Sequence, residues 1–591
     1  MTRAPLVALL AVLLALAVVP GIPPFWITLA NNIGLAALVT LGLVLLTGVG
    51  GMTSFGQAAF VGIGAYTTAV LTTVYGLSPW ASLPLVLLVT GFVAALLGLM
   101  TVRLPGFYLP LGTIAWGISL YFLFGKLDLL GRYDGIGGIP PLSIAGVSLA
   151  SPQAMYVVIW LMVLAAFVAT GNLLSSRTGR AIRALRGGGS AAESFGVDRA
   201  RTKLTVFIYA GLLAGLSGWL YAHLQRSVNP TPFGLGIGIE YLFMAVLGGA
   251  GHIWGALVGA GAIVLLKDLL QRVTPMLVGA DLQMEAVVFG AIIVIMLQTA
   301  RDGLWPRLVA LYTGGHHRQL AVPQADSPLP PRPAVAPGLT RRLLEVEAAS
   351  KNFGGLMAVK QVSFGVSAGE IVVLIGPNGA GKSTTFNLIT GVLGLSSGKV
   401  SFDGHVLADA SPRQAAALGM ARTFQHVKLV PDMTVLENVA LGAHRRARAG
   451  TLRSLLRLDR AEEARILADA ARQIDRVGLT EHLSKPAGSL ALGQQRLVEI
   501  ARALALDPRL ILLDEPAAGL RHFEKQALAE LLSKLRAEGL SVLLVEHDMG
   551  FVMGLADRIV VLNFGTLIAK GTPAEIRTHP AVIEAYLGGT E

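Results

Sequence analysis

Long apolar runs dominate the first 310 residues of this 591-residue chain. This half holds only 16 Lys and Arg and 9 Asp and Glu residues, whereas the remaining 281 residues hold 31 and 27. An apolar run of about 18 or more residues predicts a membrane-spanning helix, and a soluble core of this size would carry more charge. We therefore predict about nine or ten membrane segments, with candidates at Pro5–Pro20, Trp26–Leu46, Gln57–Tyr75, Trp80–Val102, Phe107–Phe124, Gln153–Gly171, Leu204–Leu224, Glu240–Leu266 and Gln283–Leu297.

The pattern of apolar positions changes after residue 312. Thr313–Thr340 contains six prolines and little apolar periodicity, which predicts a partly extended linker. From Leu343 onward, short apolar runs alternate with amphipathic stretches, as in an α/β domain. The sequence thus predicts a polytopic α-helical membrane domain over residues 1–312, a linker over 313–341 and an α/β domain over 342–591.

The net charge of +11 does not by itself indicate nucleic-acid binding. Seven of the positive residues lie in Arg177–Lys203, as the positive-inside rule predicts for a cytoplasmic loop. The chain has no cysteine, which excludes disulfides, cysteine zinc sites and thiol catalysis. Met1–Pro20 resembles a signal peptide but has no clear small-residue cleavage site, so we interpret it as an uncleaved first helix.

The most specific motif is the run IVVLIGPNGAGKS at Ile371–Ser383. It fits the phosphate-binding pattern G-x-x-x-x-G-K-[ST], with an apolar strand before it and a helix after it. Glycines let backbone N–H groups approach phosphate oxygens, and the helix N-terminus adds positive charge. A glycine-rich turn with a stray lysine is the alternative, but it does not explain this context. We expect ATP to be bound by Gly376, Pro377, Asn378, Gly379, Ala380, Gly381, Lys382, Ser383 and Thr384, with Lys382 on the β- and γ-phosphates and Ser383 on Mg²⁺.

Two acids end a later apolar run, LILLDE at Leu510–Glu515. Asp514 would hold Mg²⁺, and Glu515 would act as the general base on the attacking water or orient it. The alternative is a strand that happens to end in acids. That alternative is weak here, because the run follows the phosphate-binding motif within one domain.

Three single residues complete the candidate site. His547 ends another apolar run, where it would contact the γ-phosphate, and Gln425 lies in a loop where it would contact Mg²⁺ and the attacking water. Phe353 would stack on the adenine ring. Each has a structural alternative, which for Phe353 is core packing.

Between Gln425 and Asp514 lies LALGQQRLVEIARALALDP, in which Gly493 and Gln494 open an amphipathic helix. The order of GPNGAGKS, Gln425, LALGQ, LILLDE and His547 resembles an ATP-binding-cassette (ABC) ATPase over about residues 340–591. The resemblance implies that Ala491, Gly493 and Gln494 form the signature loop, which clamps the γ-phosphate of ATP held by the opposite subunit. Ala491 replaces the family's serine, so its hydroxyl contact is lost, while the Gly493 N–H and the helix N-terminus remain.

Two further segments, EPAAGL at Glu515–Leu520 and EAYLG at Glu584–Gly588, resemble the ATPases of branched-chain amino-acid importers. Four segments of the apolar half resemble the permease of the same importers, namely Gly51–Ala69, Leu104–Ala115, Thr178–Asp198 and Ala245–Ala260. The resemblance implies a permease fused to its ATPase. It also implies that the ATPase domain is cytosolic and that its hydrolysis of ATP drives import across the cytoplasmic (inner) membrane.

The same resemblance implies partners: a second permease subunit, a second ABC ATPase subunit and an extracytoplasmic amino-acid-binding protein, with no nucleic acid. It also implies that the loop Thr178–Asp198 couples the two halves, with Glu193 and Gly196 near its centre. The alternative for this loop is a solvated cytoplasmic segment. The glycine-rich breaks Gly51–Gly64 and Gly248–Gly255 either line the substrate path or pack helices closely.

Two other functions compete with import. An exporter also fuses spans to such an ATPase, but it would show six spans with long cytoplasmic extensions. A P-loop enzyme on a membrane anchor would not need LALGQ or this many spans. The sequence does not name the solute, because related importers could carry urea, amides or aromatic acids.

Overall fold

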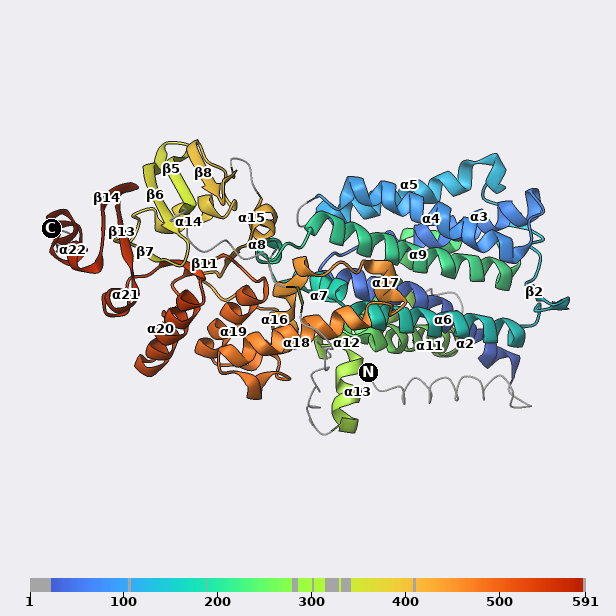
Figure 1. Cartoon of the computed structure of the whole chain (residues 1–591). Helices are drawn as coiled ribbons and strands as arrows, with labels where there is room; N and C mark the ends of the chain where they lie inside the picture. The colour runs from blue at the N-terminus through green and yellow to red at the C-terminus, as the bar shows by residue number, and fades with distance from the viewer. Residues whose placement is uncertain are drawn as a thin grey trace. The chain divides into compact units, whose positions relative to one another are not determined.

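The computed structural model describes residues 23–104, 108–187, 189–278, 285–299, 302–313, 329–330, 342–407 and 411–587. The chain divides into two compact units (Figure 1). The helical unit comprises Met1–Leu174 and Ala200–His316, and the sheet unit comprises Ser175–Arg199 and His317–Glu591. The loop predicted to couple the two halves therefore belongs to the sheet unit.

The helical unit is built from long apolar helices with two short antiparallel strand pairs between them. Its helices are α2 (Pro24–Leu43, continued by the π-helical turn η1, Val44–Val49), α3 (Gln57–Ala69, continued by η2, Val70–Val74), α4 (Pro79–Thr101), α5 (Tyr108–Lys126), α6 (Pro152–Leu174), α9 (Arg199–Gln225), α10 (Leu235–Gly249), α11 (Ile253–Val278), α12 (Glu285–Thr299) and α13 (Leu304–Thr313). The 3₁₀ turns are η3 (Asp128–Leu130) and η4 (Thr231–Phe233), and the strands are β1 (Ile136–Gly137), β2 (Ser143–Ile144), β3 (Val147–Ser148) and β4 (Ser227–Val228).

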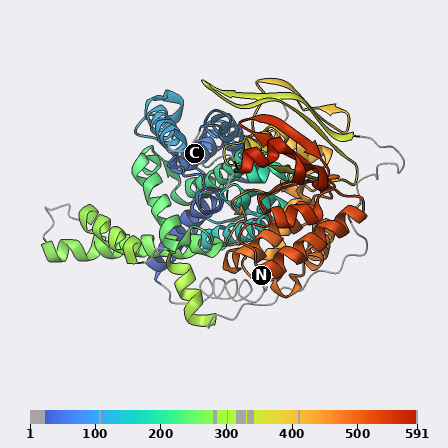
Figure 2. The same ribbon diagram turned by 90° about the vertical axis from the view of Figure 1, so that its left-hand side faces the viewer.

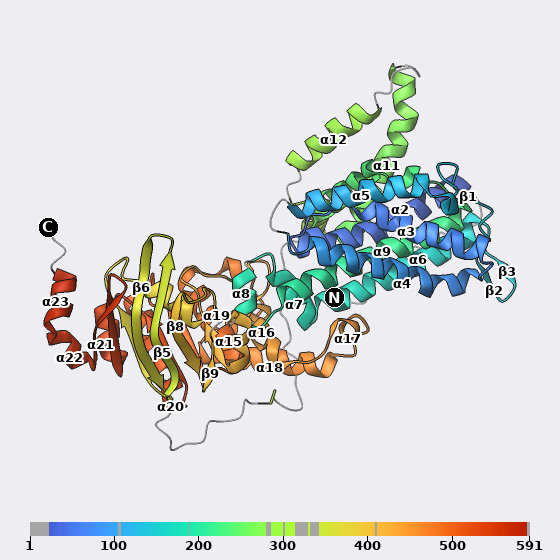
Figure 3. The same ribbon diagram turned by 90° about the horizontal axis from the view of Figure 1, so that it is seen from above.

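Seven helices among the described residues are long and apolar enough to cross a membrane. They are Pro24–Val49, Gln57–Val74, Pro79–Thr101, Tyr108–Lys126, Pro152–Leu174, Arg199–Gln225 and Ile253–Val273. The predicted run Glu240–Leu266 is divided between α10 and α11, which pack against each other. The predicted run Pro5–Pro20 lies outside the described residues. In Figures 2 and 3 the C-terminal end of α11 extends away from the other helices of this unit, and α12 runs back to pack against α10 and α11.

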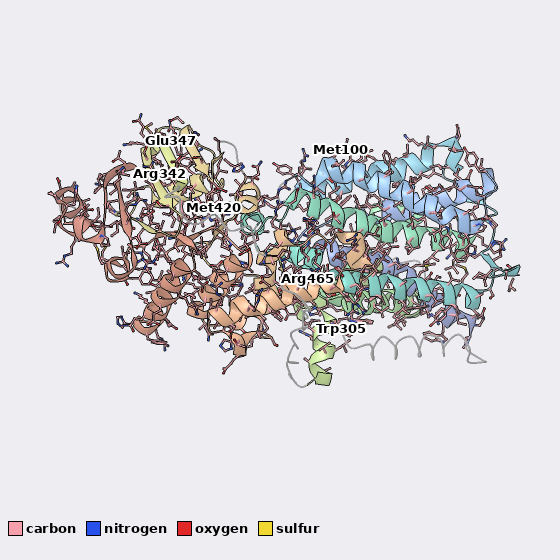
Figure 4. The ribbon with its side chains drawn as sticks, viewed as in Figure 1. Met100, Trp305, Arg342, Glu347, Met420 and Arg465 are labelled. Atoms are coloured by element: carbon pink, nitrogen blue, oxygen red, sulfur yellow. The ribbon has the colours of Figure 1, made fainter. Side chains whose placement is uncertain are left out.

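Small residues let these helices approach closely. A Cβ built on Gly64 would collide with the Gly215 carbonyl oxygen, and one on Gly248 would collide with that of Gly255. The helices therefore pack closely at these glycines, which is one of the two alternatives that the sequence offered for them. Trp305, labelled in Figure 4, stacks on Trp254 with ring centroids 6.0 Å apart and holds α13 against α11.

The sheet unit contains a six-stranded sheet in the order β10-β11-β12-β7-β13-β14 and a four-stranded antiparallel sheet in the order β6-β5-β8-β9. Figure 3 shows β5, β6 and β8 side by side, and Figure 4 labels Arg342 and Glu347 on β5. The strands are β5 (Arg342–Phe353), β6 (Leu356–Ser367), β7 (Ile371–Ile375), β8 (Ser397–Phe402), β9 (His405–Val406), β10 (Met420–Arg422), β11 (Leu510–Asp514), β12 (Ser541–Val545), β13 (Arg558–Asn563) and β14 (Thr566–Gly571).

Helices complete the sheet unit. They are α7 (Arg177–Ala184), α8 (Gly189–Ser194), α14 (Lys382–Ile389), α15 (Pro412–Leu418), α16 (Val435–Gly442), α17 (Thr451–Leu455), α18 (Arg460–Arg476), α19 (Leu492–Ala505), α20 (His522–Ala537), α21 (Met549–Leu555), α22 (Pro573–Thr578) and α23 (Pro580–Leu587), with 3₁₀ turns η5 (Ala443–Arg446), η6 (Thr480–His482) and η7 (Ala487–Ser489). Strands β7, β11 and β12 are buried at every position, which explains their continuous apolar runs.

Candidate functional site

The candidate residues meet at one edge of the six-stranded sheet. Strands β10, β11, β12 and β7 are consecutive neighbours and run parallel. Parallel strands end at the same edge, where α/β folds bind their ligands. The phosphate-binding loop follows β7, and Gln425 follows β10. Asp514 ends β11, directly before Glu515, and His547 follows β12 after one residue.

The phosphate-binding loop depends on its glycines. Gly379 and Gly381 have φ angles of 81° and 92°, which favour glycine over any residue with a Cβ. A Cβ on Gly381 would also come within 2.5 Å of the Ala358 carbonyl oxygen. The other predicted phosphate-binding residues lie in the same loop or in the first turn of α14, whose N-terminal amides lack intrahelical partners. The loop is therefore a built anion site.

Lys382 is the first residue of α14, directly after this loop. Its Nζ donates to the carbonyl oxygens of Gly376 at 2.7 Å and Pro377 at 3.0 Å. Burial lowers the pKa of the Lys382 ammonium, and the charges of Glu515 and Asp514 oppose that shift. A negative ligand in the loop would favour the charged lysine further.

Asp514 has the environment of a cation ligand. It is 5% exposed, and its Oδ1 has no hydrogen-bond partner among the described residues. Burial raises the pKa of the Asp514 carboxyl, Arg422 opposes this, and Glu515 adds to it. A buried carboxylate oxygen without a donor fits a hard cation such as Mg²⁺, which would supply the missing positive charge.

Glu515 and Gln425 are in direct contact. The Gln425 side-chain Nε2 donates to Glu515 Oε2 at 3.3 Å. Glu515 has a φ of 49°, in the left-handed region that is costly for a residue with a Cβ, and its N–H donates to the Val545 carbonyl at 3.0 Å. Tertiary contacts thus hold the carboxylate at the strand end, as at a functional site.

His547 is exposed, and its N–H donates to the buried Glu546 carboxylate at 3.1 Å. Phe353 differs from the other candidates, because it lies on β5 of the four-stranded sheet with an exposed ring. The Lys351 Nζ lies 5.4 Å from the centroid of that ring. The adenine contact of Phe353 stays a prediction.

The signature loop stands at the N-terminus of α19. Ala491 is exposed and precedes the first helical residue, and its N–H donates to Gln494 Oε1 at 3.3 Å. The Gln494 Nε2 is 2.9 Å from His482 Nε2. The first-turn amides, including that of Gly493, have no intrahelical acceptor, so this helix end attracts anions.

Sequence reasoning missed one face of α19. Arg496, Glu499 and Arg502 recur every three residues and so share a face. The Arg496 guanidinium donates to the carbonyl oxygens of Glu515 at 3.0 Å and Gln425 at 3.2 Å. The spacing of these charged residues at i, i+3 and i+6 was the signal available in the sequence. Only the hydrogen bond from Arg496 to the Glu515 carbonyl shows that this face is connected to the site.

The loop that contains α7 and α8 packs on the rest of the sheet unit. Arg180 is buried and donates to both carboxylate oxygens of Glu463, at 2.8 and 3.2 Å. Arg183 donates to Glu437 at 2.8 Å. A Cβ on Gly196, whose φ is 84°, would collide with the Arg445 side chain. The alternative of a solvated loop is therefore wrong for these residues.

Glu193 also lies in this loop. Its carboxylate is 3.9 Å from Arg199 Nη1. Burial raises the pKa of Glu193, Arg199 opposes that shift, and Asp198 adds to it. Asp198 is itself paired with Arg413 on α15.

Comparison with known proteins matches both halves of the chain. Residues 25–297 match the family model of the branched-chain amino acid transport system permease component. Residues 359–518 match the ABC transporter model, and residues 566–591 match the branched-chain amino acid ATP-binding cassette transporter model.

The ATP-binding protein LivG for high-affinity branched-chain amino acid transport in Salmonella typhimurium is 45% identical over 253 residues, 42% of this chain and 99% of the relative. The corresponding protein BraF of Pseudomonas aeruginosa is 44% identical over 253 residues, again 42% and 99%. The crystal structure of a nucleotide-free ATP-binding cassette from an ABC transporter is 32% identical, with 42% and 99% covered and a TM-score of 0.38. The chain therefore belongs to the branched-chain amino acid ABC transporter family and joins a multi-pass permease component and an ATP-hydrolysing component in one polypeptide.

Proposed function

We propose that this chain is the fused permease and ATPase subunit of a binding-protein-dependent importer of branched-chain or related amino acids in the cytoplasmic (inner) membrane. One observation carries the proposal. The phosphate-binding loop, Asp514, Glu515 and Gln425 share one sheet edge, and the permease-derived helices α7 and α8 pack on the same unit. This arrangement connects a hydrolytic site with a membrane transport unit inside one chain.

Each residue has a distinct task in the proposed hydrolysis. Lys382 and the loop amides bind the phosphates, while Ser383, Asp514 and Gln425 hold Mg²⁺, which neutralises phosphate charge when bound. Glu515 accepts a proton from the attacking water or orients it. His547 would donate a hydrogen bond to the γ-phosphate, and Phe353 would stack on the adenine ring.

One ATPase domain does not complete a site by this scheme. The signature loop of Ala491, Gly493 and Gln494 would meet ATP held by a second ABC ATPase subunit, and that subunit would supply its own loop to Lys382 and Asp514. We therefore propose a complex with a second ATPase subunit, a second permease subunit and an extracytoplasmic amino-acid-binding protein. ATP binding closes the ATPase pair, and hydrolysis reopens it, which switches the permease between outward- and inward-facing states.

Uptake in proteoliposomes tests this function. The chain is reconstituted with its candidate partner subunits, and a binding protein loaded with labelled leucine, isoleucine or valine is enclosed or added on the side opposite the ATPase. We expect uptake that requires ATP, Mg²⁺ and the binding protein together. Efflux on ATP addition would favour an exporter, and ATP hydrolysis without solute movement in either direction would favour a membrane-anchored P-loop enzyme. Uptake of urea or an amide alone would keep the importer and change its solute.

A further inference from the structure

Three leucines stand exposed on and just after α17 in the sheet unit. Leu452, Leu456 and Leu458 are 70%, 62% and 71% exposed. Figures 1 and 3 place α17 at the end of this unit opposite to α22 and α23. Single exposed leucines are ordinary, but three on one short segment form an apolar patch that folding of the unit leaves uncovered.

The segment is held in shape by specific contacts. The buried Ser454 hydroxyl donates to Asp459 Oδ2 at 2.8 Å, and the Leu458 N–H donates to the Arg453 carbonyl at 2.8 Å. Upstream, the Ala449 N–H donates to Glu462 Oε2 at 2.8 Å. The three leucines are therefore displayed by an ordered turn.

Arginines alternate with the exposed leucines along this segment. Arg448, Arg453 and Arg457 are exposed, and no Asp or Glu occurs between His444 and Leu458. A short segment in which exposed leucines and arginines occur together has the composition of an interfacial membrane contact. The arginines complement an anionic surface rather than a neutral one.

Chain connectivity keeps this segment close to a membrane surface. The span α6 ends at Leu174, and α7 begins at Arg177, three residues later, a distance of at most about 11 Å along the chain. Helix α17 packs against α7, and Arg177 Nη2 donates to the Ala449 carbonyl at 2.9 Å. The segment is thus tied to the first residues that follow the span, on the side where the positive-inside rule puts the arginine-rich loop.

We propose that residues 448–458 form a second membrane contact of this chain. Leu452, Leu456 and Leu458 enter the interface of the cytoplasmic leaflet, and Arg448, Arg453 and Arg457 bind the head groups of anionic phospholipids. This contact would hold the sheet unit at the membrane surface beside the loop that docks on it. It does not depend on which solute is transported.

The chain's lack of cysteine permits a direct test. Leu456→Cys is labelled with a fluorophore, and the full chain is placed in nanodiscs of phosphatidylcholine and phosphatidylglycerol that carry a nitroxide quencher near the head groups. Leu356→Cys is the matched control, because Leu356 is 68% exposed and lies on β6 of the same unit. We expect quenching at position 456 to exceed that at position 356 several-fold. No quenching at 456, or equal quenching at both positions, would overturn the contact.

Charge and partner controls complete the test. Quenching at 456 is expected to fall at least two-fold in phosphatidylcholine alone and in the Arg453→Glu/Arg457→Glu variant. Unchanged quenching in both would overturn the anionic partner. Addition of the partner subunits is expected to leave the quenching in place. Its loss on assembly would show that a protein covers the leucines instead.

Discussion

The ring of Phe195 lies over the guanidinium of Arg502, with Arg502 Cζ 4.6 Å from the ring centroid. Phe195 follows α8 in the docked loop, and Arg502 lies on α19, which begins at the signature loop. Arg502 donates to the Lys428 carbonyl at 2.8 Å and to Glu499 at 3.0 Å, and Glu499 accepts the Lys428 N–H at 2.8 Å. The loop is thus connected to the segment that follows Gln425 through buried groups of one helix face.

Replacing Phe195 by Leu should separate hydrolysis from transport. A desolvated cation–π contact is worth about 2 kcal/mol, and Leu keeps the apolar bulk without the ring. We expect basal ATPase activity close to that of the parent, while stimulation by loaded binding protein and uptake fall several-fold. Val197→Ala is the matched control. Val197 is buried in the same loop, but it belongs to a hydrophobic cluster that contains neither Phe195 nor Arg502. Equal loss of stimulation in both variants would mean that packing alone matters.

Replacing Glu515 by Gln tests the hydrolytic role. The variant keeps the side-chain shape but does not accept a proton, so we expect ATP binding to persist and turnover to fall by a factor of about 10²–10⁴. ATP binding by filter assay and phosphate release in the reconstituted complex measure the two effects. Glu530→Gln, at an exposed acid of α20, should change neither. Phosphate release near the parent rate would remove Glu515 from the mechanism.

Replacing Ala491 by Ser tests the altered signature loop. A serine hydroxyl would donate to the phosphate held by the partner, and a hydrogen bond to a charged group contributes roughly 1.5–3 kcal/mol. We expect ATP affinity or turnover at the site completed by this loop to rise by roughly ten- to a hundred-fold. The site built on Lys382 should not change. The measurement is made with the catalytic glutamate of each subunit disabled in turn, and identical values in both backgrounds would argue for two equal sites.

Replacing Gly196 by Ala should disturb the docked loop. The left-handed φ of 84° costs about 1–2 kcal/mol for a residue with a Cβ, and the new methyl group would collide with Arg445. We expect lower thermal stability of the chain and weaker stimulation by the binding protein. Arg445→Ala in the same chain removes the collision but not the backbone cost, so recovery should be partial. Full recovery would mean that the backbone conformation is unimportant.

The pair Arg183–Glu437 should weaken in acid. Burial alone would raise the pKa of Glu437, but Arg183 and the Thr434 N–H hold that pKa below its ordinary value. A carboxyl group whose pKa is lower in the folded state than in the unfolded state stabilises the fold. This contribution is fully present above the unfolded-state pKa of about 4.3, and it is lost as the pH falls from there through the folded-state pKa. Urea unfolding at pH 7 and at pH 3.5 should therefore show a smaller acid-induced loss in Glu437→Gln than in the parent. Equal losses would exclude this pair as the cause.

The sequence pattern predicted those features of the structure that depend on residues adjacent in the chain. The strand, the glycines and the helix of the phosphate-binding loop are consecutive, so their motif already contained the conformations that the structure has at Gly379 and Gly381. The spans α4, α6 and α9 were visible for the same reason, since a bilayer requires about 20 apolar residues in a row. The break between α10 and α11 was predicted from its glycines.

Contacts between distant residues had no such signal. Gln425 and Glu515 are 90 positions apart, and the pairing of β10 with β11 brings them together. Phe195 and Arg502 are separated by more than 300 positions, and only the packing of the docked loop on α19 brings them together. The three arginines and the three exposed leucines of residues 448–458 are ordinary in the sequence, because exposure is a property of the folded surface. The sequence by itself determined which segments are apolar enough to span a membrane, which segment carries the phosphate-binding motif and which strand ends in the candidate catalytic acids. Tertiary structure decided which side chains connect them, because hydrogen bonds and ring contacts depend on distance in space rather than along the chain.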